Sequence, residues 1–168
     1  SGSLGTLPLD HLELLLEVWA DRTRELGARD DIKYVLPFEN RGVEVGVTLT
    51  HPHGQIYAYP FIPPLAVREL AAARDFFANH RGTLLSSIVH NELADGKRTL
   101  YEGSNVVAFV PAFARYPYEV WIAPRRAVPT VADLNDAERA EFARALKTTV
   151  LAYDHLWHRP MPYLMAIH

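Results

Sequence analysis

The segment that decides how this chain folds and what it does is His51–Tyr57, with the sequence HPHGQIY. Pro52 has no N–H to donate and disfavours a helical conformation at the residue before it, so the segment is predicted to be extended. In an extended segment alternate side chains share one face, which would place His51, His53 and Gln55 together. Two imidazoles and an amide on one strand face are typical of a polar site rather than a core.

These residue types suit attack on phosphorus, although two other interpretations stay open at this point. Gly54 lets a bulky anionic ligand approach the backbone. Gln55 can donate a hydrogen bond to a developing oxyanion but cannot act as an acid or base, so one of the two imidazoles would be the nucleophile. Alternatively, two histidines at this spacing form half of a metal site, because neutral imidazole is a common ligand. A single histidine is also more often a packed or surface residue than a catalyst.

Composition places the chain among ordinary globular domains. It has 168 residues, of which 49% are hydrophobic, 11% aromatic and 22% charged, and this length is that of one domain. The net charge of −3 provides no basic surface for a nucleic-acid backbone, and no apolar run is long enough to span a bilayer. The chain has no cysteine, which excludes disulfides and thiolate metal ligands and fits a cytoplasmic location. Neither nucleic acid nor a membrane is therefore expected as a partner.

Hydrophobic periodicity and capping signals predict alternating helices and strands. The expected helices begin at Asp10, Pro64, Thr83 and Asn135. The expected strands cover residues 32–38, 57–61, 98–102, 105–110, 118–123 and 161–167. A turn is expected at Glu39–Gly42, between the first strand and the histidine motif. The residues expected to face the core from the second helix are Leu65, Leu70, Phe76 and Phe77, and those of the last helix are Phe142, Leu146, Val150, Tyr153 and Trp157.

The motif and its surroundings resemble the active-site segment of the galactose-1-phosphate uridylyltransferase family, a branch of the histidine-triad superfamily. The resemblance starts with FENRG at 38–42 and Gly46, and continues in the family's order through FIP at 61–63, ELADG at 92–96, VP at 110–111 and PY at 162–163. It implies a histidine-triad-like α+β fold in which helices pack on an antiparallel sheet. The chain is expected to hold parts of two related halves: the end of the first, with the catalytic motif, at 1–96, and the beginning of the second at 97–168.

The resemblance implies a nucleotidyltransferase of galactose metabolism that exchanges UMP between UDP-glucose and galactose 1-phosphate. His53 is expected to attack the α-phosphorus and to hold the uridylyl group covalently, while Gln55 steadies a phosphoryl oxygen. The residues that match substrate-binding positions of the family are Asn40, Gly46, Val47, Thr48 and Gln55. Thr48 keeps a hydroxyl where the family commonly has serine, whereas Leu49 and Thr50 depart from the family's pattern.

The resemblance also implies metal sites and a subunit arrangement. His51 matches a zinc ligand, but relatives complete that site partly with cysteines, which this chain lacks. Glu69 and His168 match two ligands of a second site, for iron or zinc, whose remaining His-x-His pair would lie beyond residue 168. The chain is therefore expected to be an incomplete or split form of the fold, either a homodimer or part of a complex with a chain that completes it.

Other functions stay open. Histidine-triad hydrolases usually carry a third histidine at the position of Gln55, and glutamine cannot move protons during attack by water. Dinucleoside-polyphosphate phosphorylases can carry glutamine there, but the FENRG block and the match along the chain favour the transferase. The alternative from another class is a non-catalytic fragment or subunit of a split transferase.

Overall fold

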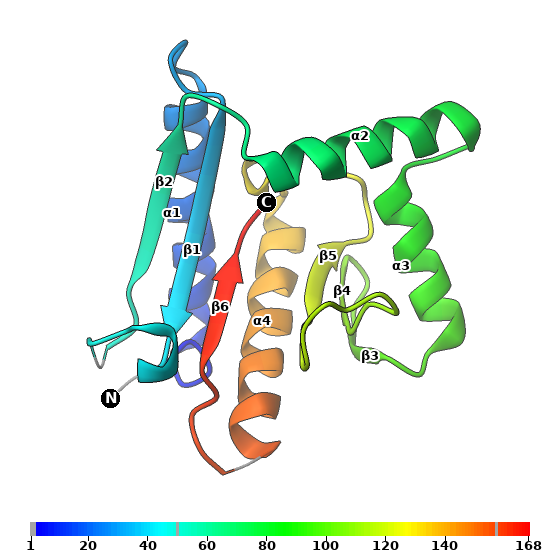
Figure 1. Cartoon of the computed structure of the whole chain (residues 1–168). Coiled ribbons are helices and arrows are strands. Elements are labelled where there is room, and N and C mark those ends of the chain that lie inside the picture. Colours follow the sequence, from blue (N-terminus) through cyan, green and yellow to red (C-terminus); the bar gives the residue numbers. More distant parts are fainter. Residues whose placement is uncertain (1–2, 50, 157) are drawn as a thin grey trace.

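The computed structural model describes residues 3–49, 51–156 and 158–168. Its helices are α1 (Leu9–Gly27), α2 (Pro64–Asn79), α3 (Leu84–Asp95) and α4 (Asp136–Leu156), with 3₁₀ turns η1 (Val43–Val45) and η2 (Val131–Asp133) (Figure 1). Its strands are β1 (Tyr34–Arg41), β2 (Gly54–Tyr59), β3 (Thr99–Glu102), β4 (Val106–Phe109), β5 (Trp121–Pro124) and β6 (Tyr163–Ala166). Of these described helices, none combines the length and the apolar character that crossing a membrane requires.

The predicted α+β class, with helices packed on antiparallel strands, is confirmed. The start of α4 is also as predicted, because Asn135 and Glu138 form a capping box in which each side chain accepts the other's backbone N–H at 2.9 Å. The predicted stripe of α4 is buried at Phe142, Leu146 and Val150. Trp157, expected on the same stripe, lies outside the described residues.

One sheet has the strand order β2-β1-β6 and joins the two ends of the chain. β1 is its middle strand and pairs antiparallel with both neighbours. α1 packs on β1 and also on α4, which precedes β6 (Figure 1). The helix–strand unit α1–β1 therefore contacts the unit α4–β6 through corresponding elements, helix to helix and strand to strand.

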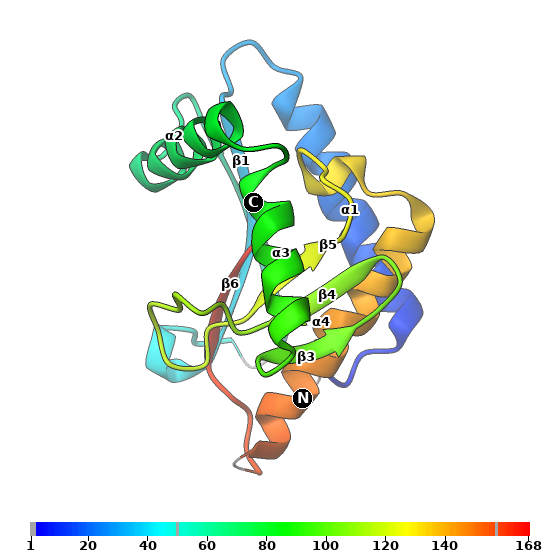
Figure 2. The same ribbon diagram turned by 90° about the vertical axis from the view of Figure 1, so that its right-hand side faces the viewer.

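A further sheet, β3-β4-β5, lies between α3 and α4 (Figure 2). All four residues of β4 are buried, as expected for a strand covered on both faces. Val106 belongs to the main core cluster with Phe142 and Leu146 of α4. Val107 packs instead with Val89 of α3, on the opposite face. The long helix α4 thus connects the two sheets.

The predicted turn at Glu39–Gly42 is wrong, because β1 continues through Arg41. Residues 38–41 pair with β6 on the far side of β1, and this distant pairing extends the strand beyond the apolar run visible in the sequence. The chain turns only at Gly42, which has a φ of +107°. A Cβ at Gly42 would lie 2.6 Å from Cβ of Pro162, so both the backbone conformation and the space require glycine.

The predicted inward packing of α2 is wrong for three of its side chains. Leu65, Leu70 and Phe77 are exposed, and Ala66 is the buried residue of this helix. α2 extends from the body of the molecule and contacts α3 rather than lying on a sheet (Figure 1). Its apolar periodicity predicts a helix correctly but does not reveal what covers that helix.

Candidate functional site

The ring of His53 is oriented by the backbone directly before β2. Its Nδ1 lies 3.0 Å from the carbonyl oxygen of His51. Because a carbonyl oxygen only accepts, Nδ1 must carry the proton and donate it. In the neutral ring this tautomer leaves Nε2 with a free lone pair. The segment therefore holds an imidazole in the form that a nucleophile requires.

A cavity of about 310 Å³ lies beside His53, between α1 and the start of β2. His53 is half-buried, so its ring is not sealed in the interior. The cavity wall is mostly apolar and includes Leu15 and Trp19 of α1. Glu39, on the neighbouring strand, also borders it. The nucleophile candidate thus lies next to a buried carboxyl group in a largely apolar setting.

Gln55 lies on the opposite face of the sheet from α1. A Cβ on Gly54 would lie 3.4 Å from the ring of Trp19, so Gly54 faces α1 and the next residue faces away. Gln55 is exposed and is paired with Phe38 of β1. Asn40, two residues further along β1, is half-buried on this same face.

The prediction that the motif forms one strand from His51 onward is wrong. β2 begins at Gly54, so the two histidines precede the strand and its alternation does not extend to them. His51 is exposed, and its ring centroid lies 6.0 Å from that of His53. The structure brings the two imidazoles together through a local bend rather than through a pleated strand.

The loop before the motif depends on two glycines with left-handed backbone, Gly42 and Gly46, which has a φ of +82°. The N–H of Val47 donates to the carbonyl of Gly42 at 3.1 Å, which closes the loop around η1. Val47 is half-buried and Thr48 is exposed. Thr50 lies outside the described residues.

The metal ligands expected from the sequence are not assembled into a site. Among residues 3–49, 51–156 and 158–168, no group of three or more His, Asp or Glu side chains could hold a metal ion. The ring of His51 lies near that of His53, whose Nδ1 is already bonded to a carbonyl. The described residues therefore do not fit a zinc site at His51 by themselves.

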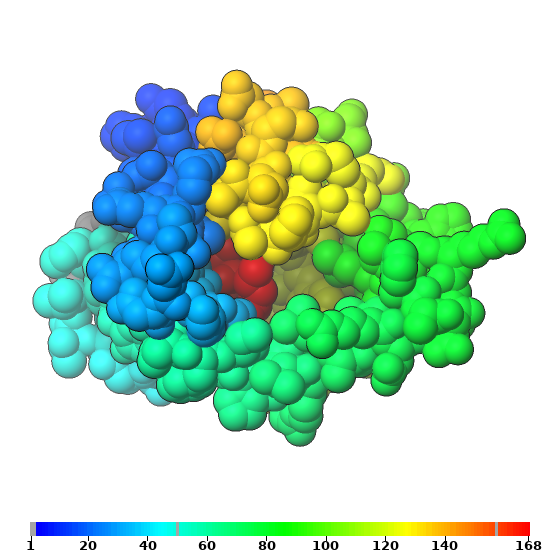
Figure 3. All heavy atoms as spheres, turned by 90° about the horizontal axis from the view of Figure 1, so that it is seen from above, coloured from blue at the N-terminus to red at the C-terminus, as the bar shows by residue number. Residues whose placement is uncertain are grey.

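Glu69 and His168 nevertheless come to the same place, beside Tyr34 of β1. The hydroxyl of Tyr34 lies 2.5 Å from Nδ1 of His168. Burial raises the pKa of Tyr34, and the negative charge of Glu69 raises it further. Figure 3 shows the C-terminal residues (red) at the bottom of a recess, with α2 (green) along its rim. Two of the expected ligands thus both lie near Tyr34, although they come from α2 and from the end of the chain.

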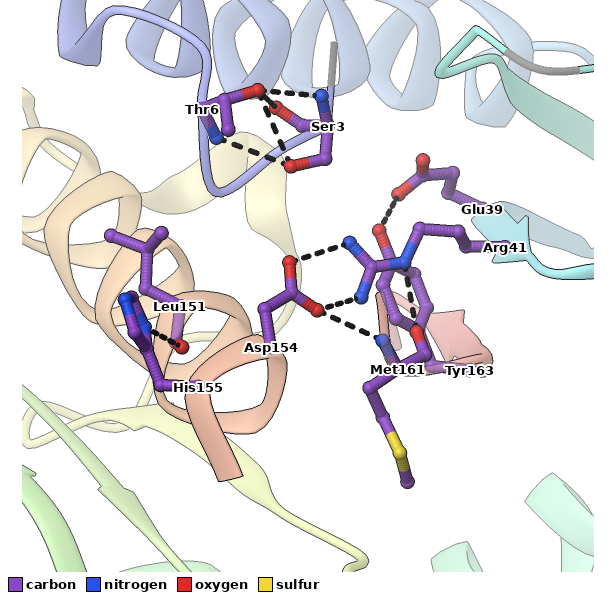
Figure 4. A network of polar contacts seen from close by, with 9 residues as sticks. All are labelled: Ser3, Thr6, Glu39, Arg41, Leu151, Asp154, His155, Met161 and Tyr163. Carbon is purple, nitrogen blue, oxygen red and sulfur yellow. Dashed lines mark hydrogen bonds and ion pairs between the residues drawn. The ribbon is translucent and has the colours of Figure 1, made fainter. Parts of the chain in front are cut away.

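Sequence reasoning missed Glu39 as a member of this site. Its side chain is only 3% exposed, and it accepts a hydrogen bond of 2.7 Å from the hydroxyl of Tyr163 (Figure 4). Burial raises the pKa of Glu39, and this increase is opposed by the Tyr163 hydrogen bond and by the charges of Arg41 and His53. The signal was present, since continued alternation from buried Pro37 would turn Glu39 inward.

Arg41 and Tyr163 connect Glu39 to the second helix–strand unit (Figure 4). The guanidinium of Arg41 lies 4.8 Å from the centroid of the Tyr163 ring and forms an ion pair with Asp154 of α4, with Nη1 3.1 Å from Oδ2. Its Nε donates to the carbonyl of Met161 at 2.8 Å. Burial raises the pKa of Tyr163, and the neighbouring charge of Glu39 raises it further. This polar network therefore joins β1 to β6 and α4 next to the candidate site.

Comparison with protein families places both parts of the chain in one family. A sequence profile described as galactose-1-phosphate uridyl transferase, N-terminal domain, matches residues 1–63. The profile of the C-terminal domain of the same enzyme matches residues 69–168. The chain is therefore similar to parts of both domains.

Individual relatives agree with the profiles. The galactose-1-phosphate uridylyltransferase of Thermotoga maritima is 42% identical over 163 residues, covering 97% of this chain and 51% of that protein. The enzyme of Streptomyces lividans is 42% identical over 172 residues, covering 99% and 48%. A solved structure of a uridylyltransferase mutant is 37% identical and superposes with a TM-score of 0.93 over 99% of this chain and 54% of that one. The chain spans about half the length of these relatives.

Proposed function

This chain belongs to the galactose-1-phosphate uridylyltransferase family, and we propose that it takes part in the exchange of UMP between UDP-glucose and galactose 1-phosphate. The observation that carries the proposal is the hydrogen bond from Nδ1 of His53 to the carbonyl of His51, because it leaves Nε2 as the reactive nitrogen. The histidine-triad-like fold expected from the sequence agrees with the structural match to a uridylyltransferase.

In the proposed reaction Nε2 of His53 attacks the α-phosphorus of UDP-glucose. The lone pair of Nε2 forms the N–P bond, and the electrons of the broken P–O bond go to the departing glucose 1-phosphate. An oxygen of galactose 1-phosphate then attacks the same phosphorus, frees Nε2 and gives UDP-galactose. Covalent catalysis replaces one difficult displacement with two easier ones. Because Nδ1 keeps its proton throughout, the same nitrogen is available again in each cycle.

The remaining residues are proposed to hold the substrate. The amide of Gln55 would donate to a non-bridging oxygen of the reacting phosphoryl group. This phosphoryl group would lie at the start of β2, within reach of both Gln55 and His53. Asn40 lies on the same sheet face as Gln55 and is proposed to contact the nucleotide. The loop of Gly46, Val47 and Thr48 is proposed to lie against the phosphates, with the hydroxyl of Thr48 as a hydrogen-bond donor.

Metal binding is proposed only where two ligands already meet. Glu69 and His168 would supply two ligands to an iron or zinc ion, and Tyr34 would orient the ring of His168 through Nδ1. Glu69 and His168 are fewer ligands than such an ion requires, so the remaining ligands would have to come from elsewhere in the assembly. No step of the proposed reaction depends on either metal.

The assembly is proposed to contain a further polypeptide segment or subunit. The chain covers about half of each relative, including 51% of the Thermotoga protein. We infer either a homodimer or a complex with a chain that completes the fold. The division into halves at 1–96 and 97–168 stays a prediction.

Retention of label tests the covalent step. The chain is incubated with UDP-glucose labelled at the α-phosphate, denatured, and assayed for bound label. We expect label on His53 that is released by acid, since a phosphorus–nitrogen bond is acid-labile, and no label on a His53→Asn variant. Gln55→Ala should slow labelling by about a hundredfold, the loss seen when an oxyanion donor is removed. Equal labelling of wild type and His53→Asn would refute the proposal, as would an unlabelled wild type.

The acceptor separates the transferase from its rivals. Galactose 1-phosphate, inorganic phosphate or buffer alone is added to labelled protein that has been freed of UDP-glucose. Rapid loss of label with galactose 1-phosphate supports the transferase. Loss with inorganic phosphate would indicate a phosphorylase, and equally fast loss in buffer alone would indicate a hydrolase.

A further inference from the structure

We propose that Glu39 is a positioning residue for His53: its carboxylate stabilises the positive charge that the imidazole ring acquires when Nε2 bonds to phosphorus. This inference rests on the proposed function, since it concerns the same nucleophile. It gives a role to a buried carboxyl group that the hydrogen bonds of the sheet do not require.

The location of Glu39 is fixed by strand register. Glu39 lies opposite Gly54 in the β1–β2 pair, and His53 directly precedes Gly54 in the sequence. Glu39 and His53 border the same cavity. Their side chains also interact electrostatically, because the charge of His53 lowers the pKa of Glu39. The surrounding wall is largely apolar, and in such surroundings charges interact several times more strongly than in water.

The charge on His53 follows from its hydrogen bond. When Nε2 forms a bond to phosphorus, the ring keeps the proton on Nδ1 and therefore becomes a cation. The partner of Nδ1 is the carbonyl of His51, which accepts a hydrogen bond but is not a base that takes the proton. The oxygens of the transferred phosphoryl group neutralise part of this charge, and Glu39 is the carboxyl group of the cavity lining that can stabilise it from the protein side.

The carboxylate is held in place from the other helix–strand unit. The hydroxyl of Tyr163 donates to Oε2 of Glu39 at 2.7 Å, and Arg41 lies over the Tyr163 ring. A purely structural role would consist of this hydrogen bond and the packing of the side chain. Glutamine keeps both, because its amide oxygen still accepts from Tyr163, but it has no charge. Glu39→Gln therefore separates the electrostatic role from the structural one.

The test uses potassium phosphoramidate at pH 8, a small donor that needs no nucleotide site. Nε2 forms the new N–P bond, the P–N bond of the reagent breaks, and ammonia leaves. Mass spectrometry of the folded chain gives the rate at which the peptide containing His53 gains a phosphoryl group, with fragmentation to distinguish His51. Exposed His90 on α3 is the internal control. We expect Glu39→Gln to slow phosphorylation of His53 about tenfold and to leave His90 unchanged.

Two further variants keep the result interpretable. Glu39→Asp retains the charge and should recover part of the rate that Glu39→Gln loses. Tyr163→Phe removes the hydrogen bond but retains the carboxylate, so it should slow the reaction less than Glu39→Gln does. A wild-type rate in Glu39→Gln would overturn the inference. So would an unreactive His53 in the wild type, or a Glu39→Asp variant as slow as Glu39→Gln.

The two proposals fail in different ways. If Glu39 affects phosphorylation by phosphoramidate but UDP-glucose leaves no label on any variant, the positioning role stands and the proposed nucleotide chemistry is refuted. If UDP-glucose labels His53 at the same rate in wild type and Glu39→Gln, the transferase proposal stands and the positioning role is refuted.

Discussion

Two buried carboxyl groups, Glu39 in β1 and Glu141 in α4, differ in the hydrogen-bond donors that the protein places around them. Their exposed fractions are 3% and 8%. Burial alone would raise the pKa of Glu141, but the backbone N–H groups of Asn105, Ser104 and Val106 outweigh it and lower the pKa. For Glu39 burial prevails and the pKa is raised, since its partners oppose it only in part.

The difference shows why one buried carboxylate only stabilises the fold, whereas the other can interact with a reacting group. Glu141 is surrounded by consecutive main-chain donors at the turn before β4, and its charge is compensated within the fold. Glu39 has a phenol hydroxyl as its hydrogen-bond donor and lies at a cavity. A carboxylate with few hydrogen-bond donors around it is stabilised most by a new positive charge beside it. This is why Glu39, and not Glu141, is suited to respond to chemistry at His53.

The largest expected effect is on stability, from Glu141→Gln. The amide cannot accept from three N–H groups as the carboxylate does, and its own NH₂ would face a donor. We expect the free energy of unfolding, measured by urea denaturation at pH 7, to fall by about 4 kcal/mol. Glu17→Gln on the exposed face of α1 is the matched control and should change little. A loss as small as that of the control would show that the turn supplies no special stabilisation.

The pH dependence of this loss follows from the direction of the shift. A lowered pKa contributes stability that is complete above the ordinary value near 4.5 and disappears as the pH falls through the lower folded value. The difference between wild type and Glu141→Gln should therefore be constant from pH 8 to about pH 5 and shrink in more acidic solution.

The second-largest expected loss of stability comes from Arg41→Met, which disrupts the polar network beside Glu39. The side chains of Arg41 and Asp154 are 16% and 20% exposed, so removing the guanidinium leaves a largely buried carboxylate without its partner. We expect a loss of about 3 kcal/mol in the free energy of unfolding. The double variant Arg41→Met/Asp154→Asn should lose less than the sum of the two single changes.

A matched control for this variant is Arg29→Met, because the ion pair of Arg29 with Asp31 is exposed and should matter little. Arg41 also lowers the pKa of Glu39, so its removal should raise that pKa further and enlarge the contrast with Glu141. If the pKa of Glu39 stays constant in Arg41→Met, the network does not act on Glu39 electrostatically.

Local signals in the sequence predicted the elements of this fold but not their partners. The Asn135–Glu138 capping box and the stripe of α4 are local features, and the structure contains both. The extension of β1 through Glu39 and Arg41 depends on pairing with β6, which lies at the other end of the chain. No local pattern encodes that pairing, so the segment was predicted as a turn. The alternation that would turn Glu39 inward was therefore not followed beyond Phe38, and the buried carboxyl group was missed.

The candidate site shows the same division between local and distant information. The histidine motif was found from its residue types, and the hydrogen bond that orients His53 is local to it. The assumption that the motif forms a strand placed His53 and Gln55 on one face, whereas β2 starts between them. The meeting of Glu69 and His168 at Tyr34 was expected from family resemblance and not from spacing.

The third effect is smaller and comes from Tyr163→Phe. Loss of the hydroxyl removes one hydrogen bond to Glu39, which should lower the free energy of unfolding by about 1 kcal/mol. The same bond lowers the pKa of Glu39, so an NMR titration of its side-chain carboxyl should show a higher pKa in the variant. Tyr116→Phe, at a ring that is 69% exposed, is the control. An unchanged pKa would mean that the hydroxyl does not stabilise the carboxylate.

The smallest effect, and the most direct test of the comparison, is the stability of Glu39→Gln. A raised pKa contributes stability that is complete below the ordinary value near 4.5 and is lost as the pH rises through the folded value. Glutamine resembles the protonated carboxyl at every pH and does not suffer this loss. Relative to wild type, the variant should therefore gain about 1 kcal/mol or less between pH 4 and pH 8, measured by urea denaturation.

This trend has the opposite sign to that of Glu141→Gln, which becomes relatively less stable as the pH rises to about 5 and keeps a constant difference from wild type above it. Opposite slopes in one protein cannot arise from a general effect of net charge, because both variants remove one negative charge. They require different hydrogen-bond partners around two buried carboxyl groups. Parallel slopes would instead make Glu39 another structural carboxylate, and its position beside His53 would then have no chemical consequence.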